Sequence, residues 1–223
     1  MRRFSKRISL NAYNTARKGG LIALELNEGD ELAWVRLTDG NQQVIVATKN
    51  GLAIRFEETD VRPMGRQARG VKAISLREGD CVVGMCVVTN DDLILTASET
   101  GFGRISNVSD YRLQSRGGKG ITNYHTEKYG NVAAVSAVKL TDDIIIISQE
   151  GVIIRIAADT VRICNRPSKG VTLMRIGEND KVVTVARAPH EDSESEKTEE
   201  TAEEETSEEN TAPETNAEEN TEE

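Results

Sequence analysis

Gly70-Val71-Lys72-Ala73-Ile74-Ser75-Leu76 belongs to a set of four related heptapeptides that decide the fold of this chain. The other three begin at Gly20, Gly120 and Gly170, so successive members are 50 residues apart. A second register supports the first, because turn glycines stand at positions 51, 101 and 151. Self-similarity at a fixed period of roughly 20 to 50 residues is typical of solenoids and propellers. The chain is therefore predicted to consist of repeated supersecondary units.

The segments between the turns are short and rich in β-branched residues. The predicted strands of the second unit are 71–76, 82–88, 93–96 and 102–105, and those of the third are 132–138, 144–148 and 152–156. None of them shows the 3.6-residue period of a helix. Asn50-Gly51 is a type I′ hairpin signal, since both central positions need positive φ. Four strands per unit and no substantial helix predict an all-β fold, a β-propeller or β-pinwheel of four-stranded blades.

The number of strands indicates an incomplete ring. One strand near residues 6–10, four in each of three full units and two after Gly170 give about 15 strands, or about four blades. Closed propellers have roughly four to eight blades. We therefore expect a partial or open ring. A first blade that begins in mid-unit at Met1 indicates a fragment that lacks earlier blades.

Charge is divided unevenly along the chain. Overall, 28 Lys and Arg residues stand against 37 Asp and Glu residues, a net charge of −9. Residues 191–223 hold 16 acidic residues and one basic residue and so carry −15, which leaves +6 for residues 1–190. A segment with almost nothing to bury cannot offset the entropy of ordering it. We predict a basic folded domain over 1–190, with its boundary near Pro189, and a disordered acidic tail over 191–223.

Several classes of function are excluded by composition. No run approaches the roughly 20 apolar residues of a membrane helix, and the basic N-terminus lacks the apolar stretch of a secretory signal. A cytoplasmic protein without a membrane partner is therefore expected. The three cysteines are too few for a disulfide framework and have no neighbouring His for zinc, so we interpret them as core residues in strands. His125, in a predicted strand, and His190 have no visible catalytic partners. We expect no cofactor, no metal and no catalytic residue in this chain.

Basic residues precede each repeat glycine. Equivalent loops of successive blades lie on the same rim of a propeller, so these residues are predicted to form a band of positive charge. A further arginine in each unit follows the hairpin glycine by three or four residues. A single basic residue in a turn is often merely solvated, but recurrence at a 50-residue period in an acidic chain favours a phosphate-binding surface. The band comprises Arg17, Lys18, Arg66, Arg69, Arg116, Lys119, Arg166 and Lys169, and the hairpin arginines are Arg55, Arg104 and Arg155.

The third unit carries the most specific motif, Gln114-Ser115-Arg116-Gly117-Gly118-Lys119-Gly120. Glycines let backbone N–H groups approach an anion closely, while Arg and Lys neutralise phosphate. The motif is not a Walker A loop, because Leu113 stands where the first glycine would be and Gly120 replaces the required Ser or Thr. It therefore indicates contact with a polyanion rather than with a nucleotide.

These seven residues resemble the box motif, Q-R-R-G-G-[KR]-G, of the C-terminal DNA-wrapping domain of the DNA gyrase A protein. The strands after Gly51 and Gly151, the stretch 59–65 and the acidic tail are also similar to that family, so the resemblance covers essentially the whole chain. It implies a six-bladed β-pinwheel whose basic outer edge wraps duplex DNA in a positive sense. In the full ATP-dependent enzyme, that wrap supports negative supercoiling. The DNA contacts that the resemblance implies are Gln114, Arg116, Gly117, Gly118, Lys119 and Gly120.

The resemblance also implies partners and leaves alternatives open. The partners would be double-stranded DNA, the gyrase B protein, and the cleavage domain of the gyrase A protein, which would lie upstream of this chain, in a bacterial, nucleoid-associated setting. Ser115 replaces an arginine of the box, and the motif stands in a late blade rather than the first. One alternative is the equivalent domain of topoisomerase IV, whose box is typically degraded. Another is a propeller scaffold that binds an acidic protein through the same rim. The nearly intact box and the long acidic tail favour gyrase.

Overall fold

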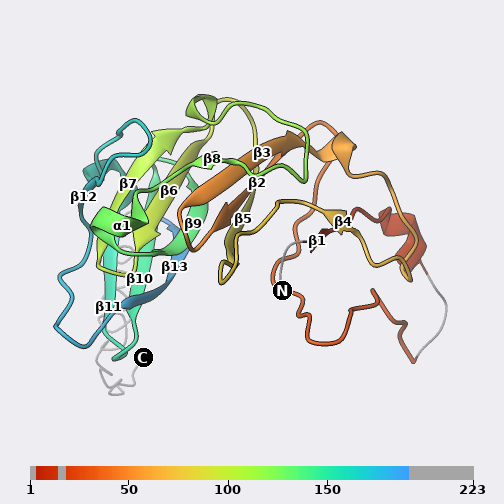
Figure 1. Cartoon of the computed structure of the whole chain (residues 1–223), viewed down its shortest axis with the longest axis horizontal. Helices are drawn as coiled ribbons and strands as arrows, with labels where there is room; N and C mark the ends of the chain where they lie inside the picture. The colour runs from red at the N-terminus through yellow and green to blue at the C-terminus, as the bar shows by residue number, and fades with distance from the viewer. Residues whose placement is uncertain (1–3, 15–18, 191–223) are drawn as a thin grey trace, which may run out of the picture. The chain divides into compact units, whose positions relative to one another are not determined.

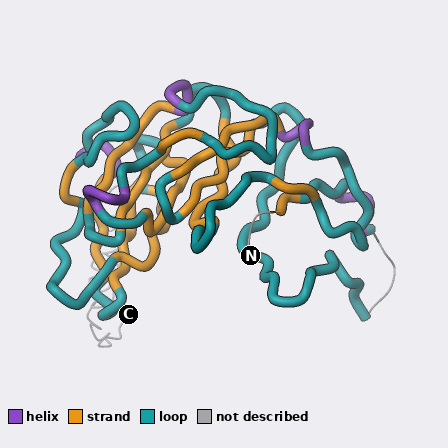
Figure 2. The backbone as a smooth tube through the Cα atoms, viewed as in Figure 1, coloured by secondary structure: helices purple, strands orange, loops and turns teal. Residues whose placement is uncertain are grey.

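The computed structural model describes residues 4–14 and 19–190. Figures 1 and 2 show a fold made almost entirely of strands and loops, with a few short helical turns. The predicted all-β repeat fold is thus confirmed. The chain divides into a unit of Met1–Pro189 and a second of His190–Glu223. The predicted disordered tail, 191–223, lies outside the described residues. No helix in the described part of the chain is long and apolar enough to cross a membrane.

The elements follow one another in a repeating order of hairpin, 3-10 turn, short strand and long strand. From here on the units are numbered by this order, so that the second unit contains β2 to β5, the third β6 to β9 and the fourth β10 to β13. The strands are β1 (Phe4–Ser5), β2 (Gln43–Thr48), β3 (Leu52–Glu57), β4 (Val71–Lys72), β5 (Val82–Val88), β6 (Leu93–Ser98), β7 (Phe102–Asn107), β8 (Ile121–Thr122), β9 (Val132–Val138), β10 (Asp142–Ser148), β11 (Ile153–Ala157), β12 (Val171–Thr172) and β13 (Val182–Pro189). The helical turns are η1 (Leu10–Tyr13), η2 (Glu58–Asp60), η3 (Val108–Asp110), η4 (Ala158–Thr160) and α1 (Thr126–Tyr129).

Each large sheet is built around one antiparallel β-hairpin. The hairpins are β2–β3, β6–β7 and β10–β11, and the first strand of each also pairs with a long strand, β5, β9 or β13. The register is the same in all three sheets, offset by 50 residues: Ile45 lies opposite Arg55, Leu95 opposite Ile105, and Ile145 opposite Arg155. The repeat seen in the sequence is therefore a repeat of sheet geometry.

The short strand of each unit completes the sheet of the unit before it. β4 pairs with β1, β8 with β3 and β12 with β7. Isolated parallel bridges extend two of these contacts, joining Arg55 to Leu113 and Ile105 to Ile163. Two sheets reach four strands in this way, whereas the sheet of β11, β10 and β13 has three in the described structure. The pairing of each short strand with the preceding unit joins successive units by backbone hydrogen bonds.

The core lies between neighbouring sheets. β9 contacts both β5 and β13, at the sheet edges opposite the short strands. Side chains alternate along β2, so that Val44 and Val46 belong to one hydrophobic cluster while Ile45 and Ala47 belong to the next. Cys86 in β5 is buried, as predicted for a core residue, and desolvation raises the pKa of its thiol to about 12. Cys81 and Cys164 were predicted in the same way, but they are only half-buried and lie outside the strands. No group of three or more metal-binding side chains is assembled within residues 4–14 and 19–190.

Three predicted strands differ in the structure. Instead of the strand predicted near residues 6–10, the chain forms β1 over Phe4–Ser5 and the helical turn η1 from Leu10. The strand predicted over 71–76 ends at Lys72, because the following backbone pairs with a loop of the next unit. There, Gly117 N–H donates to the Ala73 carbonyl and Ser75 N–H donates to the Gly118 carbonyl. His125, which was predicted to lie in a strand, is exposed and directly precedes α1.

Residues 19–41, the later part of the first unit, contain no strand. In later units the matching long strands pair with a hairpin that stands about 40 residues earlier in the chain. The stretch around Val35 pairs with no hairpin in the described structure, and Leu32, Val35 and Leu37 are exposed.

Candidate nucleic-acid interface

Three loops carry the predicted basic band. We call residues 61–70, 111–120 and 161–170 the edge loops; each follows a 3-10 turn and leads into β4, β8 or β12. The latter two run beside β3 and β7, the hairpin strands farther from the long strands β5 and β9. Each edge loop begins with a buried side chain and ends with a glycine of positive φ: these are Val61, Tyr111 and Val161, and Gly70, Gly120 and Gly170. The three loops are therefore equivalent surfaces of successive units.

The box glycines approach the backbone of the preceding unit. Gly120 has φ of 74°, and a Cβ there would lie 2.5 Å from the Ala53 carbonyl oxygen. The Gly117 N–H is engaged at 2.6 Å with the Ala73 carbonyl, and the Gly118 carbonyl is engaged at 2.8 Å with Ser75 N–H. At Gly120, which combines the close approach with positive φ, only glycine fits. The glycines thus have a structural role that their sequence interpretation as a phosphate cradle did not foresee.

Arg116 of the box motif and its counterpart Arg166 both donate hydrogen bonds to backbone carbonyls of the preceding unit, and we call these two the box arginines. Arg116 donates from Nε to the Asp60 carbonyl at 2.9 Å and from Nη1 to the Lys72 carbonyl at 3.1 Å. Arg166 does the same one unit later, to the carbonyls of Asp110 and Thr122. In both cases the two acceptors lie 56 and 44 residues earlier and bracket an edge loop. Each of these arginines therefore clamps the two ends of the preceding edge loop.

The fourth-unit clamp is also packed against an aromatic ring. The Arg166 guanidinium lies 5.0 Å from the centroid of Tyr111, and desolvation lowers its pKa despite the opposing effects of Tyr111 and Asp110. Arg66 makes a related contact in the second unit, donating to the Ile22 carbonyl at 2.7 Å. Arg66, Arg116 and Arg166 are thus half-buried connectors rather than part of a free cationic band.

Two of the hairpin arginines, Arg55 and Arg104, are buried, so their prediction as DNA contacts was wrong. Arg55 is 6% exposed and donates to the carbonyls of Val108 and Tyr111 at 2.9 and 3.0 Å, and desolvation lowers its pKa. Arg104 is 0% exposed, and its Nη2 donates to the Asn123 carbonyl. These two guanidinium groups face protein carbonyls and cannot reach a duplex outside the fold.

Arg104 is moreover not equivalent to Arg55. In the observed register Ile105 occupies the position of Arg55, so Arg104 stands one residue earlier and points to the other face of its sheet. The third hairpin arginine, Arg155, is exposed but forms an ion pair with Asp143 at 2.6 Å. The single arginine after each hairpin glycine therefore does not form one repeated surface.

Among the other predicted contacts, Arg69, Lys119 and Lys169 are exposed. Lys169 Nζ lies 3.5 Å from the centroid of the Phe102 ring, a cation–π contact. Gln114 is half-buried, and its Nε2 is buried without a hydrogen-bond partner. The predicted contacts Arg17 and Lys18 lie outside the described residues.

Sequence reasoning missed three exposed arginines in the edge loops. Arg62, Arg112 and Arg162 each follow the buried residue that opens an edge loop, and they are 50 residues apart. The signal was present, because the period of the repeat glycines also applies to these arginines. They were passed over because they stand eight residues before the glycines rather than beside them.

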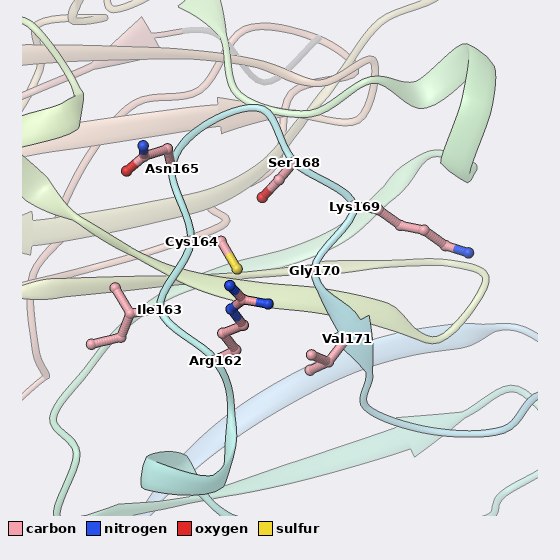
Figure 3. A pocket seen from close by; sticks show the side chains of 8 residues that line it. All are labelled: Arg162, Ile163, Cys164, Asn165, Ser168, Lys169, Gly170 and Val171. Carbon is pink, nitrogen blue, oxygen red and sulfur yellow. The ribbon is translucent and has the colours of Figure 1, made fainter.

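An open pocket of about 540 Å³ lies in the fourth-unit edge loop, lined by residues 162–165 and 168–171. Figure 3 shows the Arg162 side chain between the two limbs of the loop, directed toward Cys164 and Gly170. Lys169 extends away from the loop in the same view. The pocket therefore presents a guanidinium group and polar side chains to solvent.

Comparison with known proteins supports the same interpretation. The family described as "DNA gyrase C-terminal domain, beta-propeller" matches four successive segments, 2–39, 42–88, 92–139 and 142–189. The DNA gyrase A protein of Halalkalibacterium halodurans is 59% identical over 68 residues, which is 30% of this chain and 8% of that protein. The DNA gyrase A protein of Clostridium acetobutylicum is 54% identical over 67 residues, with the same coverage. The match thus spans less than a tenth of these curated relatives.

Solved structures share the fold. The crystal structure of the C-terminal domain of DNA topoisomerase IV has a TM-score of 0.79 at 26% identity, over 91% of this chain and 64% of that one. The structure of a DNA gyrase A C-terminal domain has a TM-score of 0.68 at 30% identity, over 77% of this chain and 59% of that one.

Proposed function

The chain belongs to the DNA gyrase C-terminal β-propeller family, and we propose that its edge loops bind and wrap duplex DNA without sequence specificity. The observation that carries this proposal is the recurrence of exposed cationic side chains on equivalent loops of successive units, every 50 residues. Phosphate contacts of this kind position a duplex but read no bases. Preference among sequences would come from how easily the duplex bends.

In the full protein, the module would serve a type IIA topoisomerase. We propose that it acts with the cleavage domain of the gyrase A protein and with the gyrase B protein, which supply DNA cleavage and ATP-driven strand passage. This chain would contribute the binding and bending of the duplex. Its acidic tail, residues 191–223, is proposed to compete with DNA for the basic loops, because a tethered polyanion stays at high local concentration.

The proposal is tested by the dependence of binding on duplex length and salt. Duplexes of 15 to about 60 base pairs, titrated by fluorescence anisotropy, are expected to bind more tightly as they grow long enough to reach successive units. Heparin should compete. A scaffold for an acidic protein would bind heparin but show no dependence on duplex length, and that outcome would overturn the wrapping proposal.

Wrapping predicts a change in DNA topology. Bending 20 to 30 base pairs costs on the order of 1 to 6 kcal/mol, which only contacts on further units offset. A nicked plasmid religated with the protein present is therefore expected to retain a shift in linking number, toward positive values if the wrap has the positive sense implied by the family. Protein added after ligation is the control. Tight binding with unchanged linking number would mean a straight, passive contact.

The box lysine is expected to contribute one phosphate contact. Lys119→Ala should lower the magnitude of the log K against log salt slope by about 0.9, with similar loss for unrelated duplex sequences. Arg69→Ala, in the matching position of the second unit, should act comparably. An unchanged slope in both variants would place these side chains away from the duplex.

The equivalent domain of topoisomerase IV remains the second candidate, favoured by the TM-score of 0.79 with such a structure. The nearly intact box and the gyrase relatives at 54% to 59% identity favour gyrase. The linking-number experiment separates the two, since the gyrase function requires a chiral wrap and a mere DNA-guiding surface does not.

A further inference from the structure

Arg62, Arg112 and Arg162 occupy one structural position in three successive units. Each directly follows a side chain that is buried at the start of the edge loop. The backbone of that buried residue is held as well, because its N–H donates to the first carbonyl of the preceding 3-10 turn at 3.0 to 3.1 Å. The three arginines therefore stand at the same position of each unit, next to a residue whose side chain and backbone are both fixed.

These arginines differ from the box arginines in what they contact. No hydrogen bond, ion pair or ring contact of their guanidinium groups exists within the described structure, and all three are exposed. Arg116 and Arg166, in contrast, commit their donors to carbonyls of the preceding unit. A guanidinium carries five N–H donors in a planar fork that matches phosphate oxygens. In each of these three units, the arginine whose guanidinium contacts no protein group within the described residues thus stands eight residues before the repeat glycine.

The fourth unit shows what such a fork presents to a ligand. Arg162 lines the open pocket of its edge loop together with Ser168, whose side chain also points into the hollow in Figure 3. A guanidinium and a hydroxyl that line the same pocket, in a loop segment without carboxylates over 161–170, suit an anionic oxygen. A phosphodiester is the anion that recurs with regular spacing along an extended partner.

We propose that Arg62, Arg112 and Arg162 are the duplex-contacting arginines of the edge loops, each placing its guanidinium on one backbone phosphate, while the box arginines hold the loops in shape. This inference rests on the proposed DNA binding. It assigns the phosphate contacts to one repeated set of arginines and the support of the edge loops to the other. The contacting set was absent from the sequence-based candidates.

The test compares two triple variants of the full chain. R62A/R112A/R162A removes the proposed contacts. R77A/K128A/R175A removes the same charge from exposed positions in the segments that lead from the short strands to β5, β9 and β13, and serves as the matched control. Binding to one 40-base-pair duplex is measured by anisotropy between 50 and 200 mM salt. Circular dichroism and the unfolding midpoint are measured for both variants.

We expect the salt slope of the first variant to fall in magnitude by about 2.7, or about 0.9 per lost contact. Over that fourfold change in salt, the wild type should then lose about 40-fold more affinity than the variant. The control should keep the wild-type slope. R62K/R112K/R162K should restore the slope, because lysine also neutralises a phosphate, and unfolding midpoints should stay unchanged in all three variants.

Two failures are distinguishable. A wild-type chain that does not bind the duplex at 50 mM salt would overturn the proposed function itself. A wild-type chain that binds with a steep salt slope, while R62A/R112A/R162A and the control behave alike, would overturn only the assignment of these arginines.

Discussion

The Asn123→Ala variant is expected to unfold with a free energy about 3 kcal/mol lower than the wild type, because it empties the centre of a buried polar network. The Oδ1 atom of Asn123 accepts from Tyr111 Oη at 2.6 Å and from Arg104 Nη2 at 3.2 Å, and its Nδ2 donates to Thr96 at 3.3 Å. All four side chains are fully buried or nearly so. Removal of the amide leaves the buried tyrosine hydroxyl without its acceptor, and it leaves Arg104 Nη2 only the backbone carbonyl of residue 123 as an acceptor. Urea unfolding, followed by circular dichroism, measures the loss.

The repeat itself supplies the control for this prediction. At the same positions 50 residues earlier and later, the chain has apolar residues: Val46 and Ile146, Ile54 and Ile154, Val61 and Val161, Ala73 and Leu173. The network is thus a polar cluster in the core of the third unit, at positions where the second and fourth units have apolar side chains. Arg104 in addition has Nε and Nη1 buried without a hydrogen-bond partner, although its guanidinium lies 5.8 Å from the centroid of the Tyr124 ring. Such an ion costs desolvation energy that its few hydrogen bonds do not fully offset.

The variant T96V/R104I/Y111F/N123A replaces the whole network with apolar side chains and is expected to recover to within about 1 kcal/mol of the wild type. Three of its substitutions are the residues found in the second unit, and Phe keeps the volume of Tyr111. If this variant were no more stable than Asn123→Ala, the network would be a net source of stability rather than a set of groups that must be satisfied together.

The fold was predictable from the sequence because the repeat is marked by glycines at positions where no other residue fits. Gly70, Gly120 and Gly170 combine positive φ with a close approach to the preceding unit, so their spacing survives even where the strands differ in sequence. The strands 82–88 and 132–138 were located to the residue for a similar reason, since each is a β-branched run bounded by turns.

The partners of individual arginines were not predictable in the same way. The acceptors of Arg116 stand 44 and 56 residues earlier, in another unit, and no local pattern reveals them. Arg104 was misassigned because its hairpin glycine is followed by one residue fewer, and a single-residue shift moves a strand side chain to the opposite face. A period in the sequence thus locates equivalent loops well, but it does not say which charged group in a loop faces solvent.

Arg166→Ala is expected to lower the free energy of unfolding by about 2 kcal/mol and to weaken DNA binding, although Arg166 itself touches no DNA in our proposal. Its guanidinium joins the carbonyls of Asp110 and Thr122, which bracket the third-unit edge loop with its box motif. Without the clamp, residues 111–121 lose the bonds that hold their two ends together. Amide hydrogen exchange should therefore accelerate within that segment and change little in the matching segment 61–71, which Arg116 still brackets.

Arg166→Lys separates a clamp from a simple phosphate contact. An ammonium group keeps the charge but cannot reach two divergent carbonyls with a planar fork, and it loses the stacking on Tyr111. We therefore expect the lysine variant to resemble Arg166→Ala in both exchange and duplex affinity, whereas Arg175→Ala, which removes an exposed charge nearby in sequence, should resemble the wild type. Full recovery of duplex affinity in Arg166→Lys, with exchange over 111–121 still fast, would instead make Arg166 a direct phosphate contact, as its place beside the repeat glycine first indicated. If Arg166→Ala showed the wild-type rate of amide hydrogen exchange over 111–121, the arginine would not be needed to hold the loop. The pairing of β8 with β3 would then be sufficient to order the segment.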